Sequence, residues 1–92
     1  MVGWGEIEIL IPASNSLKSK RHVLAPILVK LKQAYNVSVC EVEGQNTWQR
    51  ATLQLAIVGT SSDIILQAFD SILKTLEENP EIALIRQDFQ VI

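Results

Sequence analysis

The fold is decided by residues 16–36, which read SLKSKRHVLAPILVKLKQAYN. The apolar members of this stretch return at intervals of three and four residues, the spacing of one face of an α-helix; they are Leu24, Ile27, Leu28, Leu31 and Tyr35. Ser16 is the expected N-cap, because its hydroxyl can accept a hydrogen bond from an early helical N–H. The apolar spacing keeps its phase across Pro26, so we predict one helix over residues 17–35, kinked at the proline.

Segments of alternating apolar and polar residues flank this helix and predict strands. In chain order we expect a strand over 2–11, the helix over 17–35, strands over 37–43 and 48–58, a second helix over 63–78 and a strand over 82–91. In the last strand, Ile85, Phe89 and Val91 are expected to face inward. This order, β-α-β-β-α-β, is that of the ferredoxin-like α+β sandwich, with a four-stranded antiparallel sheet and two helices on one face. We expect residues 1–92 to form a single domain.

Composition narrows the class of protein. The chain has 92 residues, of which 48% are apolar and 20% charged, which favours a folded core over disorder. Its longest apolar run, 23–29, is too short to span a membrane. Glu6 and Glu8 interrupt the N-terminal apolar stretch, so no signal peptide is expected. Cys40 is the only cysteine and His22 the only histidine. We therefore expect a cytoplasmic protein without a disulfide, metal or cofactor.

Charge is distributed unevenly along the chain. The net charge is -2, yet five of the eight cations lie in the first predicted helix and all ten acids lie outside it. Lys18, Lys20 and Arg21 fall in its first turns, where unpaired N–H groups already make a helix partly positive. A sequence that breaks a local rule often does so for function. Lys30 and Lys32, near the other end, complement the helix dipole and need no further explanation.

The predicted topology gathers these cations at one corner. The first and second strands run parallel, so both end at the edge where the first helix begins. Residues around the connection between the second and third predicted strands should then lie beside Lys18, Lys20 and Arg21; they are Glu41, Glu43, Gln45, Trp48, Gln49 and Arg50. Two interpretations stay open. Either the helix start, Ser16 and the cations hold a phosphate, or Glu41 and Glu43 neutralise the cations.

Trp48 and Arg50 each allow a functional and a structural interpretation. Trp48 could stack on a base or anchor a partner. A large aromatic residue beside a hairpin more often closes the end of a core, which is what we expect here. Trp4 is treated in the same way. Arg50 could grip a phosphate, or it could pair across strands with Glu6, Glu8 or Glu41.

No catalytic constellation is visible. Cys40 should lie on the face of the sheet opposite His22, and no third group orients a base. The loop over 12–16 contains neither the Gly nor the Arg of an acylphosphatase-like phosphate loop. The central strands carry polar residues on the outer face where RNA-recognition motifs display aromatic side chains; these are Glu6, Glu8, Thr52 and Gln54. Any RNA contact is therefore expected at the basic helix edge.

Three motifs, in this order along the chain, resemble those of a known family. Ser16-Leu-Lys-Ser-Lys-Arg, Asn36-Val-Ser-Val-Cys-Glu-Val, and Gln45 with Trp48-Gln-Arg-Ala resemble the YlxP-like family, a small bacterial domain of unknown function. The resemblance covers nearly the whole chain and implies a ferredoxin-like fold. In many Gram-positive bacteria the family's genes neighbour those for a translation initiation factor and a ribosome-binding factor, which implies a task in translation or ribosome maturation. The family has no established catalytic residues.

Two positions depart from the family pattern. Ser19 stands where relatives often carry an acid, so the reciprocal capping box is expected to be lost. Pro26 stands where relatives usually have an ordinary helical residue.

Three hypotheses remain open. The first is a non-enzymatic domain that binds RNA or the ribosome through phosphate contacts from Ser16, Lys18, Lys20, Arg21 and Arg50. The second is a homodimeric or structural interaction module that uses the edge of the second strand or the outer face around Cys40, Val42 and Ala56. The third is an enzyme for a phosphorylated substrate, for which the corner offers only Glu41, Glu43 and the cations.

Overall fold

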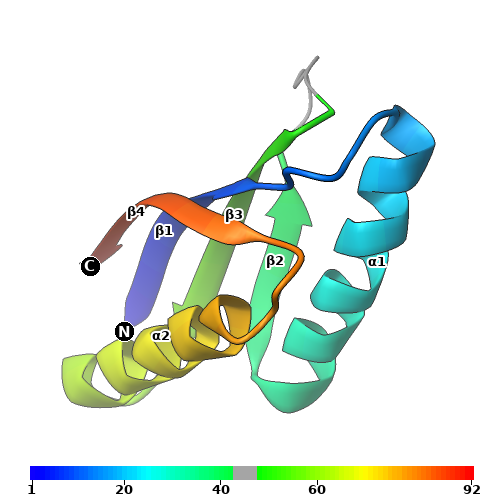
Figure 1. The fold of residues 1–92 in the computed structure, drawn as a ribbon. Coiled ribbons are helices and arrows are strands. Elements are labelled where there is room, and N and C mark those ends of the chain that lie inside the picture. The colour runs from blue at the N-terminus through cyan, green and yellow to red at the C-terminus, as the bar shows by residue number, and fades with distance from the viewer. Residues whose placement is uncertain (43–47) are drawn as a thin grey trace.

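The chain folds into two helices and four strands in the predicted order. The computed structural model describes residues 1–42 and 48–92. Its elements are β1 (Val2–Leu10), α1 (Leu17–Ala34), β2 (Val37–Glu41), β3 (Arg50–Val58), α2 (Ser62–Glu77) and β4 (Ala83–Val91) (Figure 1). Each described boundary lies within two residues of the predicted one. The predicted extension of the second strand to Glu43 falls outside the described residues.

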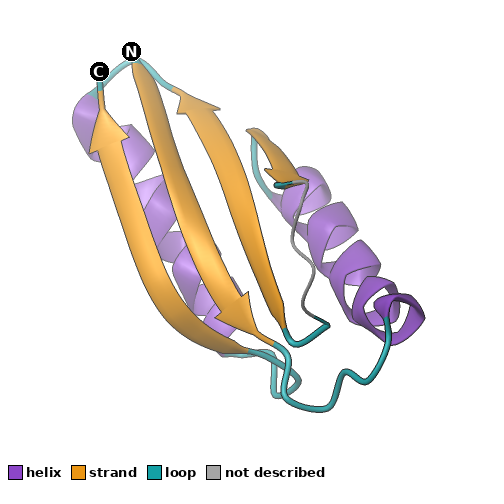
Figure 2. Cartoon of the chain, turned by 90° about the horizontal axis from the view of Figure 1, so that it is seen from above, coloured by secondary structure: helices purple, strands orange, loops and turns teal. Residues whose placement is uncertain are grey.

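The strands form one open sheet in the order β2-β3-β1-β4, and every neighbouring pair is antiparallel. β1 and β2 therefore run in the same direction without being neighbours. Both helices lie on one face of the sheet; in the view of Figure 2, α2 lies behind β1 and β4, and α1 lies beyond β2. The predicted ferredoxin-like sandwich is confirmed.

The core lies between the helices and the inner face of the sheet. β1 and β3 supply residues that are almost fully buried, among them Ile7, Ile9, Leu53 and Leu55. Near its start β1 has glycine where these larger residues would otherwise continue. A Cβ atom on Gly5 would lie 2.5 Å from the carbonyl oxygen of Asp88 and 2.5 Å from Phe89. The absence of a side chain there lets the ring of Phe89 cross β1 and stack on Phe69, with the centroids 4.0 Å apart.

The prediction for β4 is wrong at Ile85. This side chain is 43% exposed, whereas Leu84 packs against the core. The register between β1 and β4 shifts between Glu8 and Ile9, which pair with Arg86 and Leu84. The extra residue reverses the alternation, because a bulge sends every side chain beyond it to the other face. The predicted inward positions of Phe89 and Val91 hold, since both lie beyond the bulge and pack on the core.

α1 continues through Pro26 as one helix, as predicted. Proline has no N–H, so the carbonyl of His22 receives no helical hydrogen bond. Both residues are exposed, which leaves that carbonyl open to water. The kink itself stays a prediction. At its C-terminal end α1 is tied to α2, because the Tyr35 hydroxyl donates to the carbonyl of Ser71 at 3.1 Å and lies 2.8 Å from the Thr75 hydroxyl.

Candidate functional site

The start of α1 is held by three serine hydroxyls. Ser16 is the N-cap, as predicted, and its hydroxyl accepts from the Ser19 N–H at 3.0 Å. The Ser19 hydroxyl in turn accepts from the Asn15 N–H at 3.3 Å and donates to the Ser14 hydroxyl at 3.1 Å. Among the described residues the Ser19 hydroxyl accepts from Asn15, the residue before the N-cap, and not from the Ser16 N–H, so the reciprocal bond of a capping box is lost as expected. The hydroxyl of Ser16 is already used by the helix.

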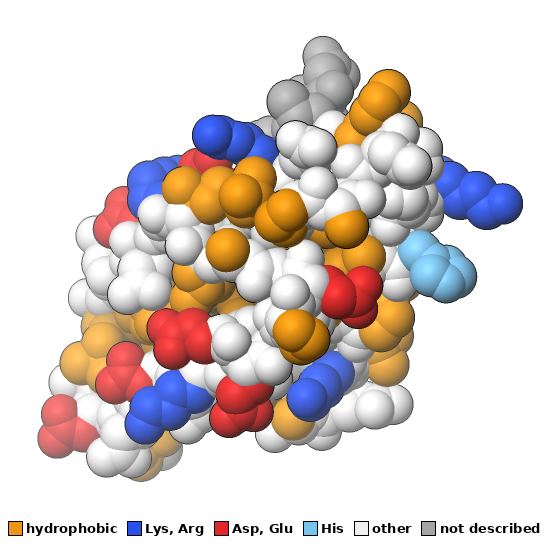
Figure 3. Space-filling model, in the orientation of Figure 1, with side chains coloured by type: hydrophobic (Ala, Val, Ile, Leu, Met, Phe, Trp, Pro, Cys, Tyr) orange, Lys and Arg blue, Asp and Glu red, His pale blue; other side chains and the backbone are white. Residues whose placement is uncertain are grey.

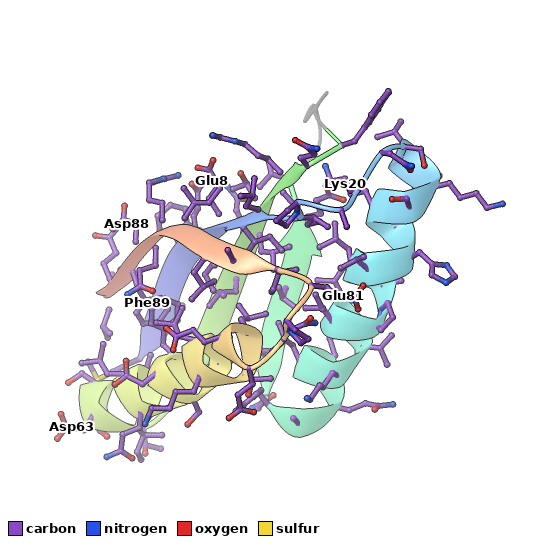
Figure 4. The ribbon with its side chains drawn as sticks, in the orientation of Figure 1. Glu8, Lys20, Asp63, Glu81, Asp88 and Phe89 are labelled. Carbon is purple, nitrogen blue, oxygen red and sulfur yellow. The ribbon has the colours of Figure 1, made fainter. Side chains whose placement is uncertain are left out.

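Lys20 belongs to the interior of the protein. Its side chain is 4% exposed, and its Nζ lies 2.9 Å from Oε2 of Glu41 at the end of β2. Figure 4 shows Lys20 reaching from α1 toward the sheet. Of the two interpretations of the basic helix start, neutralisation by Glu41 therefore describes Lys20. The burial could have been anticipated, because Lys20 stands four, seven and eleven residues before the buried Leu24, Ile27 and Leu31 and so shares their helix face.

Lys18 and Arg21 lie on the opposite side of α1, where both are exposed. In the described part of the chain neither makes an ion pair. His22 and Lys32 are also exposed and follow at helical spacing, so the four side chains form one row, which we call the basic ridge. From residue 18 to residue 32 the row is about 21 Å long, at ~1.5 Å per residue.

Arg50 and Gln49 contact β1 and the residues that follow it. Arg50 Nη1 lies 3.2 Å from Oε1 of Glu8, one of the cross-strand partners expected for it. The Gln49 amide donates to the carbonyl of Pro12 at 3.4 Å, and the Gln49 carbonyl accepts from the Ile11 N–H at 2.6 Å. The expectation that Trp48 closes the core is wrong, because this side chain is 51% exposed.

The predicted corner is thus assembled only in part. The structure brings Lys20 and Glu41 together, turns Lys18 and Arg21 outward along α1, and pairs Arg50 on the outer face of the sheet. Glu43 and Gln45 lie outside the described residues. Beside the start of α1 lies a cavity of about 410 Å³ with Ile11, Ala13 and Val23 in its wall, and Lys18 and Glu81 also line it. Figure 4 shows Glu81 on the segment between α2 and β4, beside α1.

Other chemistry finds little support among the described residues. Cys40 and His22 are both exposed, Cys40 on β2 and His22 on the solvent side of α1. Within residues 1–42 and 48–92, no three side chains of His, Cys, Asp or Glu are grouped so that they could hold a metal ion. The helices in the same ranges include none that is both long and apolar enough to cross a membrane.

Trp4 is a surface residue that sequence reasoning missed. The expectation that it helps to close the core is wrong, because it is 39% exposed on the outer face of the sheet. The alternation of β1 contains the signal, since Trp4 stands between the buried Gly3 and Gly5 and in phase with Glu6.

A family model described as "Protein of unknown function (DUF503)" matches residues 2–89. The chain belongs to the DUF503 family. A relative from Bacillus subtilis (strain 168), "Uncharacterized protein YlxP", is 37% identical over 82 residues, which is 89% of this chain and 89% of the relative. The resemblance to the YlxP-like family that the three motifs carry is confirmed. The description of the family names no activity.

Solved structures resemble the chain in fold alone. The de novo designed protein Foldit4 has a TM-score of 0.63 and 14% identity, and covers 100% of this chain and 99% of its own. The de novo designed protein LFR1 1, described as having a ferredoxin fold, also has a TM-score of 0.63, with 8% identity over 100% of this chain and 87% of its own. Their likeness shows the ferredoxin-like fold alone.

Proposed function

We propose that this DUF503 protein is a non-enzymatic binding domain for RNA, within a ribonucleoprotein such as the ribosome, and that it binds through the basic ridge of α1. The observation that carries the proposal is the charge of this helix, which has five cations and no acid. Only Lys20 among them is in an ion pair in the described residues. The proposed task is a cytoplasmic one.

The charge pattern of the whole protein supports a local contact. Acidic side chains outnumber basic ones over α2, whereas a basic side chain and the histidine project from α1 (Figure 3). A net charge of -2 disfavours indiscriminate attraction of nucleic acid. A phosphate backbone approaching this protein would therefore be attracted to one helix and repelled by the opposite side, which orients the complex.

The surface of α1 beside Lys18 and Arg21 can accommodate an extended polynucleotide chain. Lys18, Arg21 and His22 border an open hollow of about 450 Å³ over Ala25 and Pro26. Small or ring-closed side chains leave this part of the helix surface low, so a polynucleotide backbone can approach Lys18 and Arg21 closely. The paired Arg50 and the buried Lys20, which the sequence had suggested as phosphate contacts, are left out of the proposed site.

The salt dependence of RNA affinity tests the proposal. Each phosphate contact on a single strand contributes about 0.7 to the slope of log affinity against log salt concentration. Fluorescence anisotropy with a labelled single-stranded RNA should give a slope that falls in magnitude by about 1.4 in the Lys18→Ala/Arg21→Ala variant. The matched control is Arg50→Ala/Arg86→Ala, which removes the same charge from two paired side chains and should keep the wild-type slope.

Two results would contradict the proposal. One is an affinity for RNA that does not depend on salt. The other is an equal loss of slope in both double variants, because that would assign the attraction to total charge and not to the ridge.

A further inference from the structure

The outer face of the sheet, which neither helix covers, is divided into a charged and an uncharged part. In the charged part, Arg50 pairs with Glu8 at 3.2 Å, and Arg86 lies 3.6 Å from Glu6 and 3.5 Å from Glu8. The uncharged part lies toward the end of the sheet where both termini meet (Figure 2). Its side chains include no acid and no base; they are Val2, Trp4, Ser38, Cys40, Ala56, Val58 and Gln90.

A projection and a recess lie side by side in this uncharged part. Trp4 on β1 is 39% exposed, and Val2 and Val58 are exposed by 42% and 65%. Next to Trp4 is a depression of about 160 Å³ lined by the shorter side chains of Ser38, Cys40 and Ala56 on β2 and β3. A surface that carries both a projection and a matching recess can pair with a second copy of itself.

We propose that this face is the interface of a symmetric homodimer, in which Trp4 of each copy enters the depression beside Cys40 of the other. The inference is independent of RNA binding, since α1 lies on the opposite side of the sheet.

The strand register makes the pairing compatible in shape and charge. Consider a two-fold axis that lies between the two sheets and runs parallel to the strands, above the gap between β1 and β3. Each β1 residue of one copy then faces, in the other copy, the β3 residue with which it pairs in its own sheet. Trp4 faces Ala56, Val2 faces Val58, and Glu6 faces Gln54. No two like charges face each other along these strands, because Glu8 meets Thr52.

The same arrangement distributes aromatic and charged residues as protein interfaces do. Aromatic residues in the centre carry most of the binding energy in such contacts, and charged groups stay at the wet rim. Here Trp4 takes the centre, and Arg50 and Arg86 keep their glutamate partners at the charged end. At the border between the two parts, one row across the sheet is formed by Glu6, Asp88, Gln54 and Cys40. Face-to-face sheets pack about 10 Å apart, a separation that a tryptophan side chain can bridge.

Sedimentation over a range of protein concentrations tests the dimer. The wild type should pass from monomer to dimer between about 1 µM and about 1 mM. Trp4→Glu should weaken association by about thirtyfold or more, the effect of losing a central aromatic contact. Trp48→Glu is the matched control, because it changes the other exposed tryptophan in the same way and should leave the dimer intact.

Alkylation of Cys40 gives a second readout that needs no substitution. The rate of reaction with a maleimide should fall as the wild-type protein is concentrated, because the dimer covers this thiol. A protein that stays monomeric throughout, or a dimer that Trp4→Glu leaves intact, would overturn the proposal. So would a Cys40 rate that is unchanged in samples that sediment as dimers.

Discussion

Among single residues, Lys20 shows most clearly how position overrides residue type. Lys18 and Lys20 are two residues apart, yet one is exposed and the other is 3% exposed. A separation of two residues turns a side chain by about 200° around a helix with 3.6 residues per turn. Lys20 thus turns toward the core and reaches Glu41 at the end of β2, and its neighbours Lys18 and Arg21 are the ones available to a partner.

Breaking this ion pair from either side should have unequal effects on stability. Glu41→Gln leaves a buried ammonium group without its carboxylate, so the free energy of unfolding should fall by about 1–3 kcal/mol, less than for a fully buried pair because Glu41 is 32% exposed. Lys20→Met keeps the apolar stem and leaves Glu41 in contact with water, so its cost should stay below about 1.5 kcal/mol. Urea denaturation measures both. A larger loss in Lys20→Met than in Glu41→Gln would contradict this account.

Gly5 tests the close approach of Phe89 to β1. The added methyl group of Gly5→Ala would meet backbone, the carbonyl oxygen of Asp88, at 2.5 Å, and should cost about 1–3 kcal/mol of stability. At Gly59 the nearest atom is Cγ1 of Ile65 at 2.9 Å, a side-chain atom and not a backbone atom. Gly59→Ala is therefore the control and should cost less. Thermal unfolding compares the two, and equal losses would show that Phe89 is not tightly held.

Among the helices and strands, α1 contains a destabilising residue, Pro26, in its interior. Pro26 removes one helical hydrogen bond at an exposed position. Pro26→Ala should therefore raise the free energy of unfolding by about 1–3 kcal/mol, somewhat less than the full proline penalty because proline also restricts the unfolded chain. Val29→Ala, another exposed position of α1, should change stability by less than about 0.5 kcal/mol. Destabilisation by Pro26→Ala would mean that the proline fits the helix without strain.

The elements were predictable because their signals are local. Period-two and helical spacing, the Ser16 cap and the breaks at Pro12, Gly59 and Pro80 are all readable in the sequence, and all six elements follow. The prediction that Ile85 faces inward is wrong because the bulge arises from the pairing of β4 with β1. The sequence of β4 alone does not indicate such a bulge. The exposure of Trp48 likewise depends on how far the end of the core extends. The positions of Lys20 and Trp4 follow from helix and strand phase. The charge of Lys20 favoured an exposed position instead, and the size of Trp4 favoured a buried one.

For the molecule as a whole, the sandwich separates two surfaces of different character. The basic ridge lies on the helix side, and the uncharged part of the outer face lies on the sheet side, so a contact at one leaves the other free. The excess of acids over α2 completes the asymmetry (Figure 3). A dimer formed through the sheets would present two basic ridges on opposite outer sides of the assembly.

The most direct measurement is co-sedimentation with purified ribosomal subunits. Wild type should pellet with a subunit at about 50 mM salt and be released by about 200 mM, the range over which several phosphate contacts lose most of their affinity. Lys18→Ala/Arg21→Ala should stay in the supernatant at the lower salt concentration, while Arg50→Ala/Arg86→Ala should pellet as the wild type does. If no protein pellets at low salt, or if both double variants pellet equally, the basic ridge of α1 is not a ribosome-binding surface.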